Sequence, residues 1–194
     1  MPNLHEHTGP KKTIVFIDSG DTIIDEGTQQ YEADGVTVKS AECIPGAKEA
    51  LAALHKQGYT LVLVADGLAK SFENVYAQHN MKQYFSGMVY SEQVGKEKPD
   101  RHMFLSAASA IGITEENFGR VVMVGNNLAR DVKGANALGI TSIFYCWSSR
   151  YPRQPKDGSE TPDFQIHSIA ELPPLIERLE ATPAAWPNGH GGNM

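Results

Sequence analysis

Short runs of apolar residues, rich in Val and Ile, recur along the chain and end near a glycine or a polar residue. Five such runs are present, at residues 13–17, 60–65, 87–90, 121–124 and 141–146. Runs this short and this apolar suit strands that are buried on both faces, as the strands of a parallel sheet are. The pattern therefore predicts five strands of a parallel sheet.

Between these runs, apolar residues recur at helical spacing. The helical segments cover residues 45–57, 71–80, 100–111, 127–138 and 168–179. In the first of them, Ala47, Leu51 and Leu54 share one face, and Gly58 follows the expected end. Ser168 and Glu171 have the spacing of a capping box at the start of the last segment. Strands that alternate with helices predict an α/β fold with right-handed crossovers.

The chain is expected to form one domain. It has 194 residues, of which 41% are hydrophobic and 21% charged, an ordinary globular composition. We expect the domain to span residues 12–180, between a flexible N-terminal arm, 1–11, and a disordered C-terminal tail, 181–194.

Charge and composition exclude several functions. The formal net charge of −6 argues against nucleic-acid binding. No apolar run approaches the roughly 20 residues of a membrane helix, and the first residues lack a secretory signal, so we expect no membrane contact and a cytoplasmic location. Cys43 and Cys146 have no metal-ligand spacing and are expected in the core.

Candidate chemistry lies at the ends of the predicted strands, because parallel sheets bind ligands at the carboxyl ends of their strands. The residues placed there are Asp18, Ala65, Asp66, Gly67, Lys98 and Asn126, with Asp131 on the first turns of the next helix. Taken singly, Asp18 suits a loop or cap, Asp66 a helix N-cap, and Lys98 a solvated loop. Asp131 could simply oppose a helix macrodipole. Together they predict two carboxylates and a lysine at one edge.

Four segments, in this order and spacing, resemble the haloacid dehalogenase-like (HAD) superfamily over nearly all of residues 12–179. They are IVFIDSGDT at 14–22, LVLVADG at 61–67, VGKEKPD at 94–100 and VVMVGNNLARDVKGANALGI at 121–140. The last is the most specific, because its pattern G-x-x-L-x-x-D-x-x-G-A-x-x-x-G-I resembles the fourth motif of the subfamily that includes phosphoglycolate phosphatases. The resemblance implies a Rossmann-like three-layer sandwich with a central parallel sheet.

The resemblance also implies a Mg²⁺-dependent phosphatase that acts on a phosphorylated small molecule or a larger phosphorylated substrate. In it, Asp18 would attack the phosphoryl group and form an aspartyl-phosphate, which water hydrolyses. Lys98 would offset charge beside Asp18 and the phosphate. The implied metal ligands are Asp18, the Gly20 carbonyl, Asn126 and Asp131. Backbone N–H groups of Ala65, Asp66 and Gly67 would bind the phosphate with Lys98.

Three positions depart from the family pattern. Gly20 stands where most such phosphatases have an Asp that protonates the leaving oxygen, although the adjacent Asp21 could reach inward. Ala65 replaces a hydroxyl residue, and Asn126 replaces an acidic metal ligand. These departures predict weak activity or an altered mechanism. They also support an alternative, a catalytically degenerate HAD-fold protein that binds or assembles.

The insert after the first motif is too short for a separate cap domain. Residues 22–44 suffice for a hairpin flap, with strand pieces at Tyr31 and 35–38. A capless site admits a large substrate, is covered by another subunit in a homo-oligomer, or accepts small phosphates with little selectivity. The loop 147–163, with Arg150 and Tyr151, is a second lid candidate or a solvated connection.

Two further activities fit less well. Dehalogenation by the same Asp18 benefits from a closed apolar pocket, which the missing cap disfavours. A phospho-acceptor receiver module shares the parallel α/β plan, but its acceptor Asp follows the third strand rather than the first.

Overall fold

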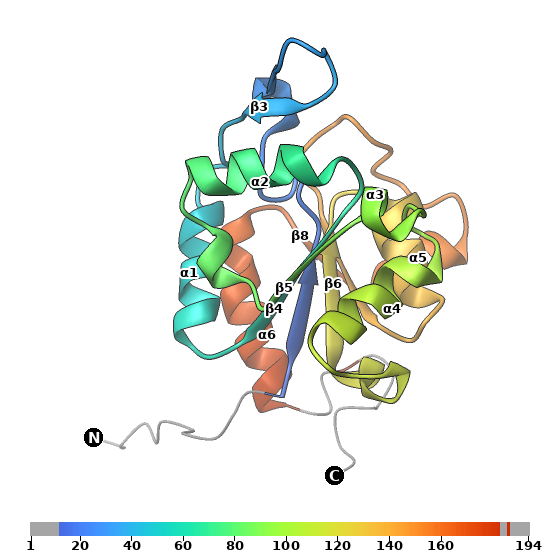
Figure 1. Cartoon of the computed structure of the whole chain (residues 1–194). Coiled ribbons are helices and arrows are strands. Elements are labelled where there is room, and N and C mark those ends of the chain that lie inside the picture. Colours follow the sequence, from blue (N-terminus) through green and yellow to red (C-terminus); the bar gives the residue numbers. More distant parts are fainter. Residues whose placement is uncertain (1–11, 183–185, 187–194) are drawn as a thin grey trace.

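A central parallel sheet organises the molecule, as a computed structural model describes it for residues 12–182 and residue 186 (Figure 1). Six strands lie in the order β5-β4-β1-β6-β7-β8, and every neighbouring pair is parallel. Their bounds are β1 (Ile14–Ile17), β4 (Thr60–Ala65), β5 (Gly87–Tyr90), β6 (Val121–Gly125), β7 (Thr141–Tyr145) and β8 (Phe164–Ile166). The five predicted strands are confirmed. The edge strand β8 was not predicted, because its three residues include an exposed Gln165 and form no apolar run.

Helices cover both faces of the sheet, which confirms the three-layer sandwich (Figure 1). The helices are α1 (Ala47–Lys56), α2 (Ala69–Gln78), α3 (Ser91–Val94), α4 (Arg101–Ala110), α5 (Lys133–Asn136) and α6 (Leu172–Ala181). Alternate strand residues face opposite layers: Val15 and Ile17 pack with α1 and α6, whereas Ile14 and Phe16 pack with α4. The short 3-10 helices are η1 (Glu26–Thr28), η2 (Lys82–Tyr84), η3 (Glu115–Arg120), η5 (Gly158–Glu160) and η6 (Ile169–Glu171). The element η4 (Leu128–Val132) is a π-helical turn.

The helix predicted over 127–138 is divided into two parts. A π-helical turn, η4, comes first, and α5 follows it. The side chain of Asn127 caps the turn by accepting a hydrogen bond from Ala129 N. Single π-helical turns are frequent at functional sites. The capping box predicted at Ser168 and Glu171 is present, before η6 rather than directly before α6.

The ends of the predicted domain differ in what the structure describes. The predicted arm, 1–11, lies outside the described residues. Within the predicted tail, Ala181 belongs to α6, and Trp186 is buried with its Nε1 donating to Leu179 O at 2.9 Å. The other residues of the tail beyond Thr182 lie outside the described part of the chain.

The insert between β1 and α1 is an antiparallel hairpin of β2 (Gln30–Tyr31) and β3 (Val38–Ser40), as predicted, without a cap domain in this segment. Residues 35–37 form its turn rather than a strand, because Asp34 Oδ1 accepts hydrogen bonds from Val36 N and Thr37 N. The hairpin stands beside α2, above the carboxyl ends of the strands (Figure 1). Among the described residues, no helix is long and apolar enough to span a membrane.

Candidate active site

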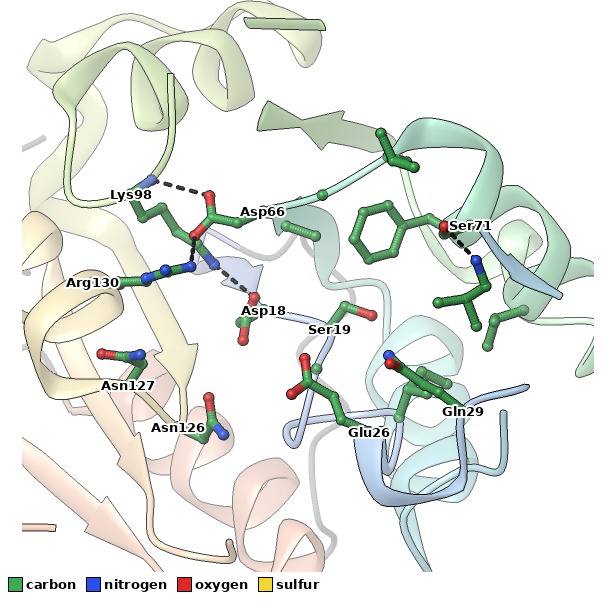
Figure 2. Close-up of a pocket in the computed structure, with 18 of the residues that line it drawn as sticks. Asp18, Ser19, Glu26, Gln29, Asp66, Ser71, Lys98, Asn126, Asn127 and Arg130 are labelled. Atoms are coloured by element: carbon green, nitrogen blue, oxygen red, sulfur yellow. Dashed lines mark hydrogen bonds and ion pairs between the residues drawn. The ribbon is translucent and has the colours of Figure 1, made fainter. Parts of the chain in front are cut away.

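Asp18, Lys98 and Asp131 meet at the carboxyl edge of the sheet, as the strand ends predicted. Lys98 Nζ lies 2.6 Å from Asp18 Oδ1 and 2.8 Å from Asp131 Oδ1, and it donates to Val64 O at 2.7 Å. The side chains of Lys98 and Asp131 are 1% exposed, whereas that of Asp18 is 13% exposed. Asp18 is therefore the member of the cluster that a ligand can reach. Figure 2 shows the Lys98 side chain pointing toward Asp18.

The environment keeps Lys98 charged. Burial lowers the pKa of its ammonium, but the negative charges of Asp131 and Asp18 outweigh burial and hold this pKa above its ordinary value. Burial raises the pKa of the Asp131 carboxyl, and the charge of Lys98 opposes that shift. A buried ion pair with several hydrogen bonds fixes side-chain positions more than it adds stability. Lys98 thus supplies a fixed positive charge beside Asp18.

Asp66 ties two loops together rather than capping α2. Its Oδ1 accepts a hydrogen bond from Lys98 N at 3.0 Å, and its Oδ2 lies 3.3 Å from an Arg130 nitrogen. The residue at the N-cap of α2 is Leu68, which makes no side-chain capping bond. Asp66 therefore holds the backbone of Lys98 in place and aligns Arg130 at the rim of the cavity.

The proposed phosphate loop, residues 65–67, lies beside this cluster. The Gly67 N–H donates to Ser91 Oγ at 2.9 Å, so a phosphate oxygen would have to replace that partner. Gly67 has φ +144°, a backbone conformation that residues other than glycine rarely adopt. Phosphate binding by the N–H groups of Ala65, Asp66 and Gly67 stays a prediction.

Oxygen donors for a cation surround Asp18. No group of three or more His, Cys, Asp and Glu side chains in the described part of the chain could hold a metal. A cation would instead use Asp18 and Asp131, the Asn126 amide and the Gly20 carbonyl. In the β-bridge between Gly20 and Ile24, Ser19 O accepts a hydrogen bond from Ile24 N, and Asp21 N donates one to Ile24 O. The Gly20 carbonyl takes no part in this bridge.

The Asn126 amide supports this donor set. Its buried Nδ2 has no hydrogen-bond partner among the described residues, which is costly for a buried polar group. Rotation of the amide by half a turn exchanges its nitrogen and oxygen, which places an oxygen donor where the unpaired nitrogen lies. Carboxylate, amide and carbonyl oxygens with added waters are what Mg²⁺ accepts. The residues present therefore fit a hard divalent cation, with one fewer negative charge than an acidic residue at 126 would give.

Asp21 does not reach the cavity. Its carboxylate is fully buried on the other side of the turn, where Oδ1 accepts from Glu26 N at 3.0 Å and Oδ2 lies 2.8 Å from Arg150 Nε. The backbone of Asp21 has φ +47°, which directs this side chain away from Asp18. Asp21 therefore does not reach inward to replace the acid that position 20 lacks.

Glu26 reaches the cavity instead, and the sequence reasoning missed it. It lies in η1, directly after the nucleophile turn, and Figure 2 shows its carboxyl group pointing toward Asp18. Its Oε2 lies 3.2 Å from Arg150 Nε. Burial, and then the charges of Asp21 and Asp18, raise the pKa of Glu26. The sequence signal that could have indicated Glu26 is a carboxylate a few residues after Asp18, in a motif that has glycine at position 20 in place of an acid.

A cavity of about 320 Å³ opens above Asp18. Its polar end contains Asp18, Glu26, Asp66, Lys98, Asn126, Arg130 and Asp131. The rest of its lining is mostly apolar and includes Ile24, Tyr31, Val36, Val38, Leu68, Phe72 and Val75, beside Gln29 and Ser71. The hairpin therefore walls a site that lacks a cap domain. Tyr151 also lines it, so the loop 147–163 belongs to the site rather than being only a solvated connection.

The sheet, the covering helices and the carboxylate–lysine cluster together define a Rossmann-like α/β fold with its candidate site at the carboxyl ends of the strands. The family model for haloacid dehalogenase-like hydrolases matches residues 3–145, more than half of the chain. The chain belongs to the haloacid dehalogenase-like hydrolase family.

Two curated relatives are phosphatases. The chain is 29% identical over 126 residues to the glyceraldehyde 3-phosphate phosphatase of Methanopyrus kandleri, covering 65% of this chain and 53% of that protein. It is 30% identical over 128 residues to the phosphoserine phosphatase of Thermus thermophilus, covering 66% of this chain and 49% of that protein. The chain thus spans about half the length of the curated relatives that it matches.

A solved structure agrees in fold over most of this chain. An uncharacterized protein from Listeria monocytogenes serotype 4b superimposes with a TM-score of 0.68 at 23% identity. The match covers 88% of this chain and 99% of that one. At this identity the similarity establishes the fold alone.

Proposed function

We propose that this protein is a Mg²⁺-dependent phosphatase that hydrolyses phosphate monoesters through an aspartyl-phosphate on Asp18. One observation carries the proposal: Asp18 faces the cavity while Lys98 Nζ, 2.6 Å away, bridges it to Asp131. A reachable carboxylate beside a fixed positive charge can attack a phosphoryl group that would otherwise repel it. The phosphatase relatives support the same reaction class.

The residues divide the work between nucleophile and electrostatic support. A carboxylate oxygen of Asp18 forms a bond to phosphorus as the bond to the leaving oxygen breaks. Lys98 offsets the negative charge gathered by Asp18 and the phosphoryl oxygens, and Arg130 lies at the rim where an incoming phosphate passes. Water then hydrolyses the aspartyl-phosphate and returns Asp18 to its free carboxylate.

Asp18, Asp131, Asn126 and Gly20 are the residues that would hold Mg²⁺. When bound, the cation neutralises phosphoryl charge and aligns the group for in-line attack. Asn126 contributes no charge, so we expect weaker Mg²⁺ affinity than an acidic residue at that position would give. Asp131 is held in place by Lys98 and by Asn127 N, which donates to its Oδ2 at 3.0 Å.

The cavity supports a phosphorylated small molecule as the substrate. The charged residues around Asp18 fit the phosphate, and the mostly apolar lining from the hairpin and α2 fits a leaving group with apolar surface. The alternative, a degenerate HAD-fold binding protein, rests on Gly20, Ala65 and Asn126. It predicts no turnover and no Mg²⁺-linked binding of phosphate.

The proposal is tested by comparing the protein with its Asp18→Asn variant on a panel of phosphate monoesters with Mg²⁺. We expect turnover by the wild type, and a loss of at least about a thousandfold in kcat for the variant, because the nucleophile is removed. Asp25→Asn, on the same segment but directed to Gly27 N, is the control and should retain activity. Equal turnover by wild type and Asp18→Asn would reject Asp18 as the nucleophile. Absence of turnover together with absence of Mg²⁺-linked phosphate binding by the wild type would favour the alternative.

A further inference from the structure

Glu26 fills the space that a side chain at position 20 would occupy. The three atoms nearest to a Cβ built on Gly20 all belong to Glu26, with Cδ at 2.7 Å and Oε1 closer still. Gly20 does not have positive φ, so its backbone would accept any residue. The Glu26 side chain is what a side chain at position 20 would meet first. The carboxyl group therefore lies beside the turn that carries Asp18, although it comes from six residues further along the chain.

Two contacts hold Glu26 in this position. Asp21 Oδ1 accepts a hydrogen bond from Glu26 N at 3.0 Å, which fixes the backbone of η1. Arg150 Nε lies 2.8 Å from Asp21 Oδ2 and 3.2 Å from Glu26 Oε2. Arg150 thus binds one oxygen of Glu26 and leaves Oε1 directed over Gly20. The loop 147–163 acts here as a support for the carboxyl group.

The other carboxylates that line the cavity are engaged elsewhere. They are Asp18, Asp66 and Asp131. Asp18 and Asp131 both pair with Lys98, and Asp66 accepts from Lys98 N and pairs with Arg130. Glu26 is the cavity-lining carboxyl group of the described residues that makes no contact with Lys98. A phosphate ester with a poor leaving group needs a proton donor at the departing oxygen.

We propose that Glu26 is the general acid and base of the phosphatase, supplying from position 26 the carboxyl group that position 20 lacks. The inference rests on the proposed function. As Asp18 bonds to phosphorus, the bond to the leaving oxygen breaks and its electron pair stays on that oxygen, which takes the proton of the Glu26 carboxyl. In the second step, a water oxygen bonds to phosphorus, Glu26 takes the water proton, and the bond to Asp18 breaks. Glu26 then carries its proton again.

The test compares wild type and Glu26→Gln on two phosphate monoesters: an alkyl phosphate, whose leaving oxygen needs a proton, and p-nitrophenyl phosphate, whose leaving oxygen does not. The ratio kcat/KM reports only the steps up to release of the alcohol. We expect Glu26→Gln to lose about 10²- to 10⁴-fold in kcat/KM on the alkyl phosphate and less than about tenfold on p-nitrophenyl phosphate. Glu32→Gln, an exposed carboxyl on the same insert, should match wild type on both.

A double variant keeps the test independent of folding defects at position 26. Glu26→Ala removes the atoms that crowd Gly20, and Gly20→Asp in the same chain restores a carboxyl group beside Asp18. We expect this pair to regain at least about tenfold in kcat/KM on the alkyl phosphate over Glu26→Ala alone. An equal loss on both esters, or no loss on either, would overturn the role of Glu26 while wild-type turnover persists. No wild-type turnover on either ester would instead overturn the proposed function.

Discussion

The Lys98 ammonium is enclosed by three oxygen atoms at 2.6–2.8 Å, from Asp18, Asp131 and Val64. The amine itself is buried, so these contacts replace its hydration shell. Removal of one partner of a buried ion pair leaves the other charge unpaired, and this costs more than the pair contributes net. Loss of the Lys98 side chain should therefore affect both the free energy of unfolding and the proposed activity.

Lys98→Met is expected to lower the free energy of unfolding by about 3–5 kcal/mol, because Asp131 would remain buried without its counter-charge. It should also abolish turnover. Urea unfolding, with the slope compared between variants, measures the change. Lys96→Met removes an exposed lysine from the same loop and should change stability by less than about 0.5 kcal/mol. A Lys98→Met protein as stable as this control would contradict the account of the cluster.

The sequence predicted that Asp18, Lys98 and Asp131 lie together, but it did not predict that Glu26 joins them at the cavity. Asp18, Lys98 and Asp131 were predictable because parallel strands end at one edge, which brings distant residues together. Glu26 was not, since its position depends on a hairpin backbone and on Arg150, 124 residues away, neither of which a strand pattern specifies. Asp21 looked closer to the site in sequence, but the turn directs it to Arg150.

The hairpin is the element that gives this small domain a walled site. Its strand β3 packs on α2, where Ser71 Oγ accepts a hydrogen bond from Val38 N at 2.9 Å and Asn74 Nδ2 donates to Val38 O at 3.0 Å. Val38 and Ser71 are both buried. The hairpin turn, by contrast, exposes Val36 by 64%. The docking of this element therefore depends on a few bonds at its base.

Ser71→Ala is expected to loosen the hairpin, because the buried Val38 N–H would lose its acceptor at a cost of about 1–3 kcal/mol. Hydrogen exchange should become faster for residues 30–40, while amides of β1 keep their protection. Ser109→Ala, at an exposed position on α4, is the control. Unchanged exchange in the hairpin would show that packing alone docks β3.

Element prediction succeeded where one periodicity persisted and failed where a tertiary contact overrode it. The helical spacing predicted α1, α2, α4 and α6, each with one buried face. The π-helical turn η4 was not predicted, because it forms where Asp131 is drawn inward to Lys98 and Asn127 N. Close packing also marks this region, since a Cβ on Gly134 would overlap the Phe104 ring.

Among the residues that the structure describes, the candidate catalytic residues gather at the carboxyl ends of the central strands. The strand ends supply Asp18 and Asn126, a loop supplies Lys98, and η4 supplies Arg130. The insert supplies Glu26 and, with α2, the apolar wall. The order of strands and motifs therefore predicted the fold class and the end of the sheet at which the candidate site lies. The shape of the cavity was not, because the hairpin and the loop 147–163 have no periodic pattern.

The central claim, that Asp18 accepts the phosphoryl group, is tested most directly by a crystal structure grown with Mg²⁺ and beryllium fluoride, a tetrahedral phosphoryl mimic. The account predicts that beryllium is bonded to an Asp18 carboxylate oxygen. Lys98 should remain on the same carboxylate, and Mg²⁺ should contact Asn126 and Asp131. Beryllium fluoride bonded to another side chain, or a cavity left empty at a saturating concentration, would contradict it.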